Sequence, residues 1–524
     1  MAKFTSKTIT LSTLLFGAFS MGVFAQTTNR VLVIDEGVDL QHSELAARAF
    51  VNGAEGSGTA GRDDDNNGFI DDISGWNAIS RDSEFFPAWV RKMFADNTTT
   101  VGKLLALYNR IEEGDASAME VIRSNPDIGQ ALNTVLGLSH GTHVGGIVVR
   151  YGNPAAQVAS LNVFTSSQEP GNGEQAASPS FNQRFSVSNP LARFKRLANR
   201  MLAEGGAEGS GPQAQGFTSQ FDDTAGISAF LSQLRTEEQA EKDILARYVA
   251  SMRPKVANLS LGAAKLGIRQ ALDSMWEEEL LAAKLPLSTV RTATQESNYQ
   301  RMLNDSFEIF RGSWNSFFRA NSSTLFVVAA GNDADDKEVP NAGDNAINEV
   351  LPANCSKDNA NVITIAATTP EGVIADFSNY NSSLVQVAAW GTAVPSLAPN
   401  NNTVKMSGTS MAAPNAAGVA SKLFSVNDRL SPDQARLILE GTVKKFAALK
   451  GRVSAEGMID AQAALDAARR ANAVNIVAAI GAAVQSRNVA RQLPSLFSSP
   501  FETADATRPG QVHKTPTLVK AFMR

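Results

Sequence analysis

Cysteine and histidine are both scarce in this chain of 524 residues. Cys355 is the single cysteine, so an intramolecular disulfide is excluded, and stability has to come from a packed core or a bound metal. The residues around Cys355 carry no nucleophile signature, so we interpret it as a structural thiol. A histidine base has to come from a short list, because the only histidines are His42, His140, His143 and His513.

Strong charge of either sign and long apolar runs are also lacking. The formal net charge is −5, and no dense basic cluster predicts nucleic-acid binding. Hydrophobic residues make up 43% of the chain and charged residues 19%, which is typical of a globular protein. Beyond the N-terminus no run approaches the ~20 apolar residues of a membrane-spanning helix. We therefore expect a soluble, monomeric protein that does not bind membranes.

The N-terminus has the features of a Sec-type signal peptide. Lys3 and Lys7 precede an apolar run over residues 11–24, and the small residue Ala25 stands at the expected cleavage point. An uncleaved membrane anchor is the alternative, although the run is short for a spanning helix. We expect residues 1–25 to be removed and the protein to be secreted or periplasmic.

Short apolar runs that end in polar residues predict an open, mostly parallel α/β sheet flanked by helices. Residues 30–38 contain Asp35 at the end of such a run, and residues 324–332 end in Asn332. Residues 256–262 form another run with a polar exit. Functional groups gather at the carboxyl ends of parallel strands, so Asp35 and Asn332 are candidate site residues. Further strands are expected at residues 159–164, 362–367 and 385–388.

Two segments of very small side chains predict helices. Residues 139–149 begin Ser-His-Gly-Thr-His, and residues 406–420 begin Met-Ser-Gly-Thr-Ser-Met-Ala-Ala-Pro. We predict that His140 opens the first helix and that Ser410 caps the second, with Pro414 in its first turn. A lone serine before a helix is more often an ordinary N-cap residue, but a hydroxyl there also lies in the positive potential of the helix end.

The pair of His140 and His143 could also suggest zinc, but the acid of a His-Glu-x-x-His motif is missing. Asp35, His140, Ser410 and Asn332 form instead the set that acyl transfer requires. The serine attacks, the histidine takes and returns its proton, the acid fixes the imidazole tautomer, and the amide donates to the oxyanion.

Five motifs in order resemble the subtilisin-like serine peptidases (subtilases). They are Asp-x-Gly, His-Gly-Thr-His-Val-x-Gly, Asn-x-Ser-x-Gly, Ala-Ala-Gly-Asn and Ser-Gly-Thr-Ser-Met-Ala-Ala-Pro. The order Asp, His, Ser is also that of subtilisin. The resemblance implies a secreted serine endopeptidase with the triad Asp35, His140 and Ser410, and with Asn332 as oxyanion donor.

The resemblance also implies a structural role for His143 and an added-strand mode of binding for an extended polypeptide substrate. The implied substrate-binding residues are Asn258, Leu259, Ser260, Leu261 and Gly262. Glu36 departs from the family, which usually has Ser or Thr there, and puts an extra negative charge beside Asp35. Only about five residues separate the expected cleavage site from the first strand, so we expect folding without an N-terminal propeptide.

An acidic loop near residue 65 follows the first nine positions of a calcium-binding loop. We predict a structural calcium ion there, because five acids in ten residues repel one another unless a cation lies among them. A solvated acidic turn is the alternative, and no organic cofactor is expected. The predicted ligands are Asp63, Asp65, Asn67, the Phe69 carbonyl and Asp71.

We expect a peptidase domain over residues 26–467, followed over residues 468–524 by a C-terminal helix and a poorly ordered tail. Three insertions interrupt the domain, at about residues 83–136, 165–252 and 263–322. An aromatic stripe from Phe307 to Phe318 in the third insertion is interpreted as core packing.

Three other functions remain open. One is a catalytically silent binding protein on a subtilase scaffold, although all four catalytic groups are present. A serine esterase would have Gly-x-Ser-x-Gly, and Ala412 stands in place of its second glycine. A sedolisin-type acid peptidase shares the Gly-Thr-Ser element but would lack a histidine base.

Overall fold

The computed structural model describes residues 29–169, 194, 197–198, 219–336, 339–472 and 475–492. The expected signal peptide, most of the insertion after residue 165 and the end of the C-terminal tail lie outside this range. Within the described residues, no helix is both long and apolar enough to span a membrane.

A nine-stranded sheet forms the centre of the molecule, in the order β12-β13-β9-β8-β6-β4-β1-β3-β2. Every neighbouring pair is parallel except β12 and β13, so the predicted open, mostly parallel sheet is confirmed. The strands are β1 (Arg30–Asp35), β2 (Gly75–Asn77), β3 (Gln157–Asn162), β4 (Val256–Leu259), β6 (Leu325–Ala329), β8 (Val362–Thr368), β9 (Val387–Trp390), β12 (Lys444–Lys445) and β13 (Gly457–Met458).

Successive residues of β1 face opposite sides of the sheet, and both sides are buried. Val33 belongs to a core shared with helices α5 (Pro126–Tyr151) and α11 (Thr409–Val426). Ile34 belongs to a second core, shared with α8 (Thr224–Met252) and α10 (Ala293–Ala320). The sheet therefore lies between two helical layers, and α5 and α11 pack against each other on one of its faces.

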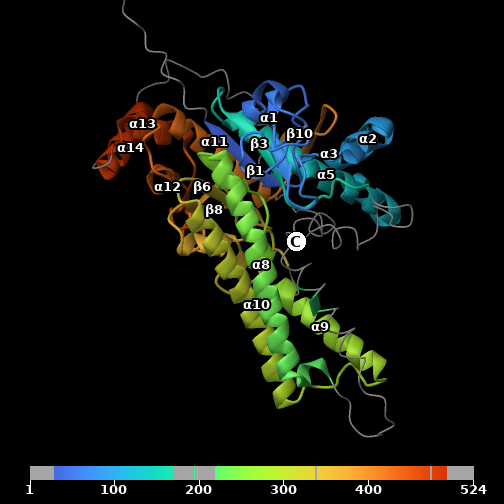
Figure 1. Ribbon diagram of the computed structural model, residues 1–524. Helices are drawn as coiled ribbons and strands as arrows, with labels where there is room; N and C mark the ends of the chain where they lie inside the picture. Colours follow the sequence, from blue (N-terminus) through green and yellow to red (C-terminus); the bar gives the residue numbers. More distant parts are fainter. Residues whose placement is uncertain are drawn as a thin grey trace, which may run out of the picture.

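Helices α8 and α10 form a long arm that projects from the sheet, with α9 (Lys265–Ala282) beside it (Figure 1). At ~1.5 Å per residue, the 29 residues of α8 reach about 43 Å. The predicted aromatic stripe of α10 is buried between these helices and the sheet. Its members are Phe307, Phe310, Trp314, Phe317 and Phe318.

Six further helices belong to the first insertion and the C-terminal end. The first insertion forms α2 (Ala88–Asp96), α3 (Thr98–Glu112) and α4 (Ala116–Ser124) ahead of α5. Near the C-terminus, α12 (Pro432–Gly441) begins with proline, which lacks no hydrogen bond at that position. The single helix expected beyond residue 467 is two helices, α13 (Ala461–Arg470) and α14 (Ile476–Gln492), and α13 crosses the expected domain boundary.

Two helix starts differ from prediction. Helix α5 begins at Pro126, so His140 lies well inside it, because the helix of the insertion continues without a break into the His-Gly-Thr-His motif. Helix α11 is capped by Gly408, so Ser410 is its second residue and not the cap. Pro414 is consequently its sixth residue. It lies beyond the first turn, where the backbone N–H groups have no partner in the helix, so its missing N–H leaves one carbonyl of the helix without a donor.

Candidate active site

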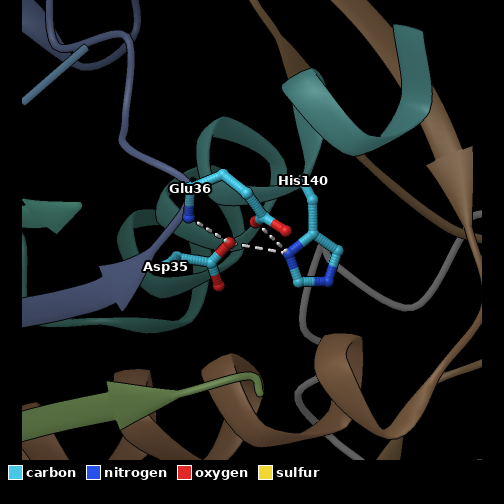
Figure 2. Close-up of side chains that lie close together, drawn as sticks. All are labelled: Asp35, Glu36 and His140. Atoms are coloured by element: carbon cyan, nitrogen blue, oxygen red, sulfur yellow. Dashed lines mark hydrogen bonds and ion pairs between the residues drawn. The ribbon is translucent and has the colours of Figure 1, made fainter. Parts of the chain in front are cut away.

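Asp35 and His140 meet at the carboxyl end of β1. The Nδ1 atom of His140 lies 2.7 Å from Oδ1 of Asp35, whose side chain is fully buried. Nδ1 also lies 3.1 Å from Oε2 of Glu36, and the two carboxylates face the same ring nitrogen (Figure 2). The Glu36 amide donates to Oδ1 of Asp35 at 3.0 Å, which helps to hold that oxygen in place. The imidazole is thus oriented through Nδ1, and its Nε2 remains for another partner.

Two glycines allow this approach. Gly37 has a φ of +99°, which a side chain would strain, and a Cβ there would lie 2.2 Å from the Phe85 carbonyl oxygen. A Cβ on Gly141 would lie 2.2 Å from the carbonyl oxygen of Gly37. Because Gly141 has no side chain, α5 can pack against the turn that follows β1 and bring His140 to Asp35. Gly37 lets that turn form and lets Phe85 approach it from the other segment.

The three groups shift one another's pKa values. Burial alone would raise the pKa of Asp35, but the positive charge of His140 and the hydrogen bonds from Glu36 and His140 outweigh it and lower that pKa. Burial alone would lower the pKa of His140, yet the charges of Asp35 and Glu36 raise it well above its usual value. Burial, followed by the charge of Asp35, raises the pKa of Glu36 to about 8.

Ser410 is held by Ser260, the residue that follows β4. The Ser410 hydroxyl donates to the Ser260 carbonyl oxygen at 3.2 Å, and the Ser260 hydroxyl donates to the Ser410 carbonyl oxygen at 2.8 Å. In a regular helix the Ser410 carbonyl would accept from residue 414, but Pro414 has no N–H. Ser260 supplies the missing donor. The described residues show no hydrogen bond between His140 and Ser410.

Asn332 lies shortly after the end of β6, and its side-chain oxygen accepts hydrogen bonds from the first residue of α11. Its Oδ1 accepts from the backbone N–H and the hydroxyl of Thr409, at 2.8 and 3.0 Å. Its Nδ2 makes no hydrogen bond to any described residue, so the amide N–H₂ is the end that remains to donate. Asn332 and Ser410 are thereby linked through Thr409, the residue that precedes the serine.

Only part of the predicted substrate segment is accessible. Asn258 and Leu259 are fully buried in β4 and are paired on both sides, with β1 and β6, so their predicted contact with substrate is wrong. Asn258 instead donates from Nδ2 to the Ser260 hydroxyl at 2.9 Å. Leu261 is half-buried and Gly262 is exposed. The stretch from Ser260 to Gly262 belongs to no strand. It is therefore the part of the predicted segment whose backbone can pair with a substrate strand.

The other two described histidines and the cysteine take no part in this arrangement. His143 is fully buried, and its Nε2 lies 3.1 and 3.0 Å from the carbonyl oxygens of Val394 and Val404, in strands β10 (Val394–Ala398) and β11 (Asn402–Met406). Burial lowers the pKa of His143 to about 3. His42 contacts the Asn402 carbonyl, and burial raises the pKa of the Cys355 thiol. His513 lies outside the described residues.

The acidic loop brings together a different set of carboxylates from the predicted one. Glu55, Asp65 and Asp72 have oxygens within 4.8 Å of one another, and of these three only Asp65 was predicted. Both oxygens of Asp63 accept backbone N–H groups, from Asn67 and Gly68.

The remaining predicted ligands hold the loop together. An oxygen of Asp71 accepts from the Gly61 amide, and Asn67 donates from Nδ2 to Asp72. The Phe69 ring packs edge-on against Trp76, with ring centroids 4.8 Å apart. The spacing of acidic residues located the loop. It could not predict the contribution of Glu55, because Glu55 lies outside the loop, in the short helix α1 (Gly53–Ser57).

Two of the clustered carboxylates, Glu55 and Asp72, are buried. Oxygen donors at this density suit a hard cation such as Ca²⁺. The side-chain amides of Asn52 and Asn67 donate to Asp65 and Asp72, and the Asn67 backbone N–H also donates to Asp65. The donor set therefore fits calcium, with Glu55 and Asp72 in place of Asp63 and Asp71.

Comparison with known proteins shows the family of the chain. The sequence model of the Subtilase family matches residues 208–471, which is half of the chain and includes Ser260, Asn332 and Ser410. The chain belongs to the subtilase family. The matched range begins after Asp35 and His140, so the pairing of these two residues comes from the structure and not from the family match.

Relatives of this subtilase are proteases, each matched over a limited region. The cell wall-associated protease of Bacillus subtilis is 38% identical over 125 residues, which cover 24% of this chain and 12% of that protein. The extracellular basic protease of Dichelobacter nodosus is 34% identical over 158 residues, or 28% of this chain and 24% of that protein. Among solved structures, proteases from Pseudoalteromonas arctica are 18% identical, with a TM-score of 0.37 over 84% of this chain and 89% of theirs.

Proposed function

We propose that this subtilase is a serine endopeptidase in which Ser410 is the nucleophile, His140 the general base and Asp35 the acid that orients it. The observation that carries the proposal is the 2.7 Å contact between Asp35 Oδ1 and His140 Nδ1. Because that contact engages Nδ1, the other ring nitrogen can take the proton of a serine hydroxyl. Membership of a peptidase family supports the same reaction.

Attack on a peptide requires a change at Ser410. Its hydroxyl donates to the Ser260 carbonyl oxygen, and it has to exchange that acceptor for Nε2 of His140 before it can lose its proton. Catalytic hydrogen bonds are often long or misdirected in substrate-free enzymes and tighten when substrate binds. The proton then passes from His140 to the leaving amine, and Asp35 stabilises the imidazolium in between.

Asn332 and the stretch from Ser260 to Gly262 complete the proposed site. The N–H₂ group of Asn332 donates to the oxyanion, and its orientation is kept by the two hydrogen bonds from Thr409 to its oxygen. Leu261 and Gly262 are accessible backbone beside the serine, so they pair with an extended polypeptide substrate as an added strand.

Labelling by a fluorophosphonate probe tests this function directly, because the probe reacts only with an activated serine. The full chain should be labelled, and Ser410→Ala and His140→Ala should abolish labelling. Ser425→Ala is the matched control, since Ser425 is an exposed serine on the same helix, and it should be labelled like the parent. A folded parent protein that resists the probe would instead favour the catalytically silent binding protein.

We also propose that the acidic loop binds calcium as a structural ion, through Glu55, Asp65 and Asp72. The two buried carboxylates of this set support a cation more strongly than the loop spacing alone does. Export is a further proposal, supported by the signal-like residues 1–25 and by the relative from Dichelobacter nodosus, which is an extracellular protease.

A further inference from the structure

Glu36 is the charged residue closest to the proposed catalytic pair that the reaction does not use. Its Oε2 lies 3.1 Å from Nδ1 of His140, only slightly farther than Asp35 Oδ1 at 2.7 Å. A single N–H therefore faces two carboxylates, which Figure 2 shows on the same side of the imidazole. The Glu36 side chain is 24% exposed and that of Asp35 is fully buried, so of the two carboxylates only Glu36 reaches solvent.

We propose that Glu36 is a positioning residue that shares the Nδ1 hydrogen of His140 with Asp35, and that it thereby sets the pH range in which His140 acts as a base. The inference rests on the proposed function, because it assigns a role toward the same histidine. The usual Ser or Thr at this position could donate a hydrogen bond but could not carry a negative charge. Glu36 can do either, depending on whether it holds a proton.

The titratable groups around Glu36 come from two elements. Asp35 lies at the end of β1, and His140 and His143 lie on α5. The charge of His140 contributes to lowering the pKa of His143, after burial. Within the described structure, no lysine or arginine is hydrogen-bonded or ion-paired to Glu36. Among the described residues, His140 is therefore the cationic partner of Glu36. Burial and the charge of Asp35 raise the pKa of Glu36 to about 8, and the charges of Asp35 and Glu36 raise the pKa of His140.

The direction in which Glu36 shifts the pH profile follows from the protonation states of His140 and Glu36. The base form needs neutral His140, whereas an ionised Glu36 favours the imidazolium, so Glu36 moves the acid limb of the activity profile to higher pH. Above that limb an ionised Glu36 stabilises the imidazolium that forms when Ser410 gives up its proton. Where it is ionised, Glu36 thus lowers the rate on the acid limb and raises the plateau at alkaline pH.

The test compares the full chain with Glu36→Gln and Glu36→Ser by fluorophosphonate labelling rate between pH 5 and 10. Both variants should move the midpoint of the acid limb down by about one pH unit and lower the alkaline plateau, so that their profiles cross that of the parent. Glu36→Asp keeps a carboxylate and should stay closer to the parent midpoint. A role in folding alone would scale the rate at every pH without moving the midpoint.

A second readout is independent of reactivity. The chain has only four histidines, and the NMR signal of the His140 ring can be assigned with His140→Ala and followed against pH in a Ser410→Ala background. The His140 titration should move down by a similar amount when Glu36 is replaced. An unchanged His140 midpoint in both folded Glu36 variants would overturn the inference. Labelling that persists in Ser410→Ala would overturn the proposed function instead, so the two failures are distinguishable.

Discussion

The buried carboxylate of Glu112 accepts a hydrogen bond from the hydroxyl of Ser407, three residues before the proposed nucleophile. Glu112 is the last residue of α3, in the first insertion, and its other oxygen accepts from the Tyr108 hydroxyl at 2.6 Å. Ser407 in turn accepts from the Ala393 amide at 2.7 Å. The insertion, which has no catalytic motif, therefore holds the chain that leads into α11.

Replacing Glu112 should loosen that chain. Glu112→Ala leaves the hydroxyls of Tyr108 and Ser407 without their acceptor in a buried site, and each unsatisfied group costs about 1–3 kcal/mol. We expect a lower free energy of unfolding and slower fluorophosphonate labelling. Glu113→Ala is the control, because Glu113 pairs with Lys405 at the surface and surface pairs contribute ~0–1 kcal/mol. Equal stability losses in the two variants would contradict the anchoring role.

The Ser260 hydroxyl and Pro414 should be energetically coupled. Ser260→Ala leaves the Ser410 carbonyl without a donor, because Pro414 cannot supply one. Pro414→Ala restores an N–H at that position of the helix, so Ser260→Ala should destabilise the protein less in the Pro414→Ala background. A double-mutant cycle by chemical denaturation should give a coupling of about 1 kcal/mol. Additive effects would show that the hydroxyl does not compensate for the proline.

Two substitutions of Asn332 separate oxyanion binding from loop support. Asn332→Ala removes the donor and also the acceptor of the Thr409 hydrogen bonds, whereas Asn332→Asp keeps the acceptor and cannot donate when ionised. Both should lower kcat by ~10²–10³ with little change in KM, a figure that comes from subtilisin itself. Only the alanine variant should also lower the melting temperature. An aspartate variant with full kcat would remove Asn332 from the oxyanion site.

The sheet and the polar residues at its edge could be predicted because both depend on local pattern. Runs such as that of β1 are apolar throughout, as buried parallel strands are, and Asp35 and Asn332 follow such runs directly. The start of α5 could not be predicted, because nothing in the sequence around His140 shows that the helix began at Pro126. Likewise, the burial of Asn258 depends on strands that pair with β4 from distant parts of the chain.

The partners of the site residues could not be predicted from the sequence either, because these residues meet only through tertiary contacts. Glu36 was visible as an extra charge beside Asp35, but its approach to His140 depends on how α5 packs over Gly37. Glu112 and Ser407 are almost three hundred residues apart, and no spacing rule links them. Sequence patterns could therefore predict a set of candidate reacting groups, while the residues proposed to position them required the structure.

Calcium binding distinguishes the clustered carboxylates from the set that loop spacing predicted. Asp72→Asn and Glu55→Gln each remove a charge from the cluster, whereas Asp63→Asn removes one whose two oxygens already accept backbone N–H groups. Calcium at 100 times its Kd should stabilise the parent by about 2.7 kcal/mol, and EGTA should reverse the effect. We expect this stabilisation, measured by thermal unfolding with and without calcium, to be lost in the Asp72 and Glu55 variants and largely kept in Asp63→Asn. Loss in Asp63→Asn alone would return the ligand set to the one that loop spacing predicts, and an unchanged calcium effect in all three variants would place the ion elsewhere.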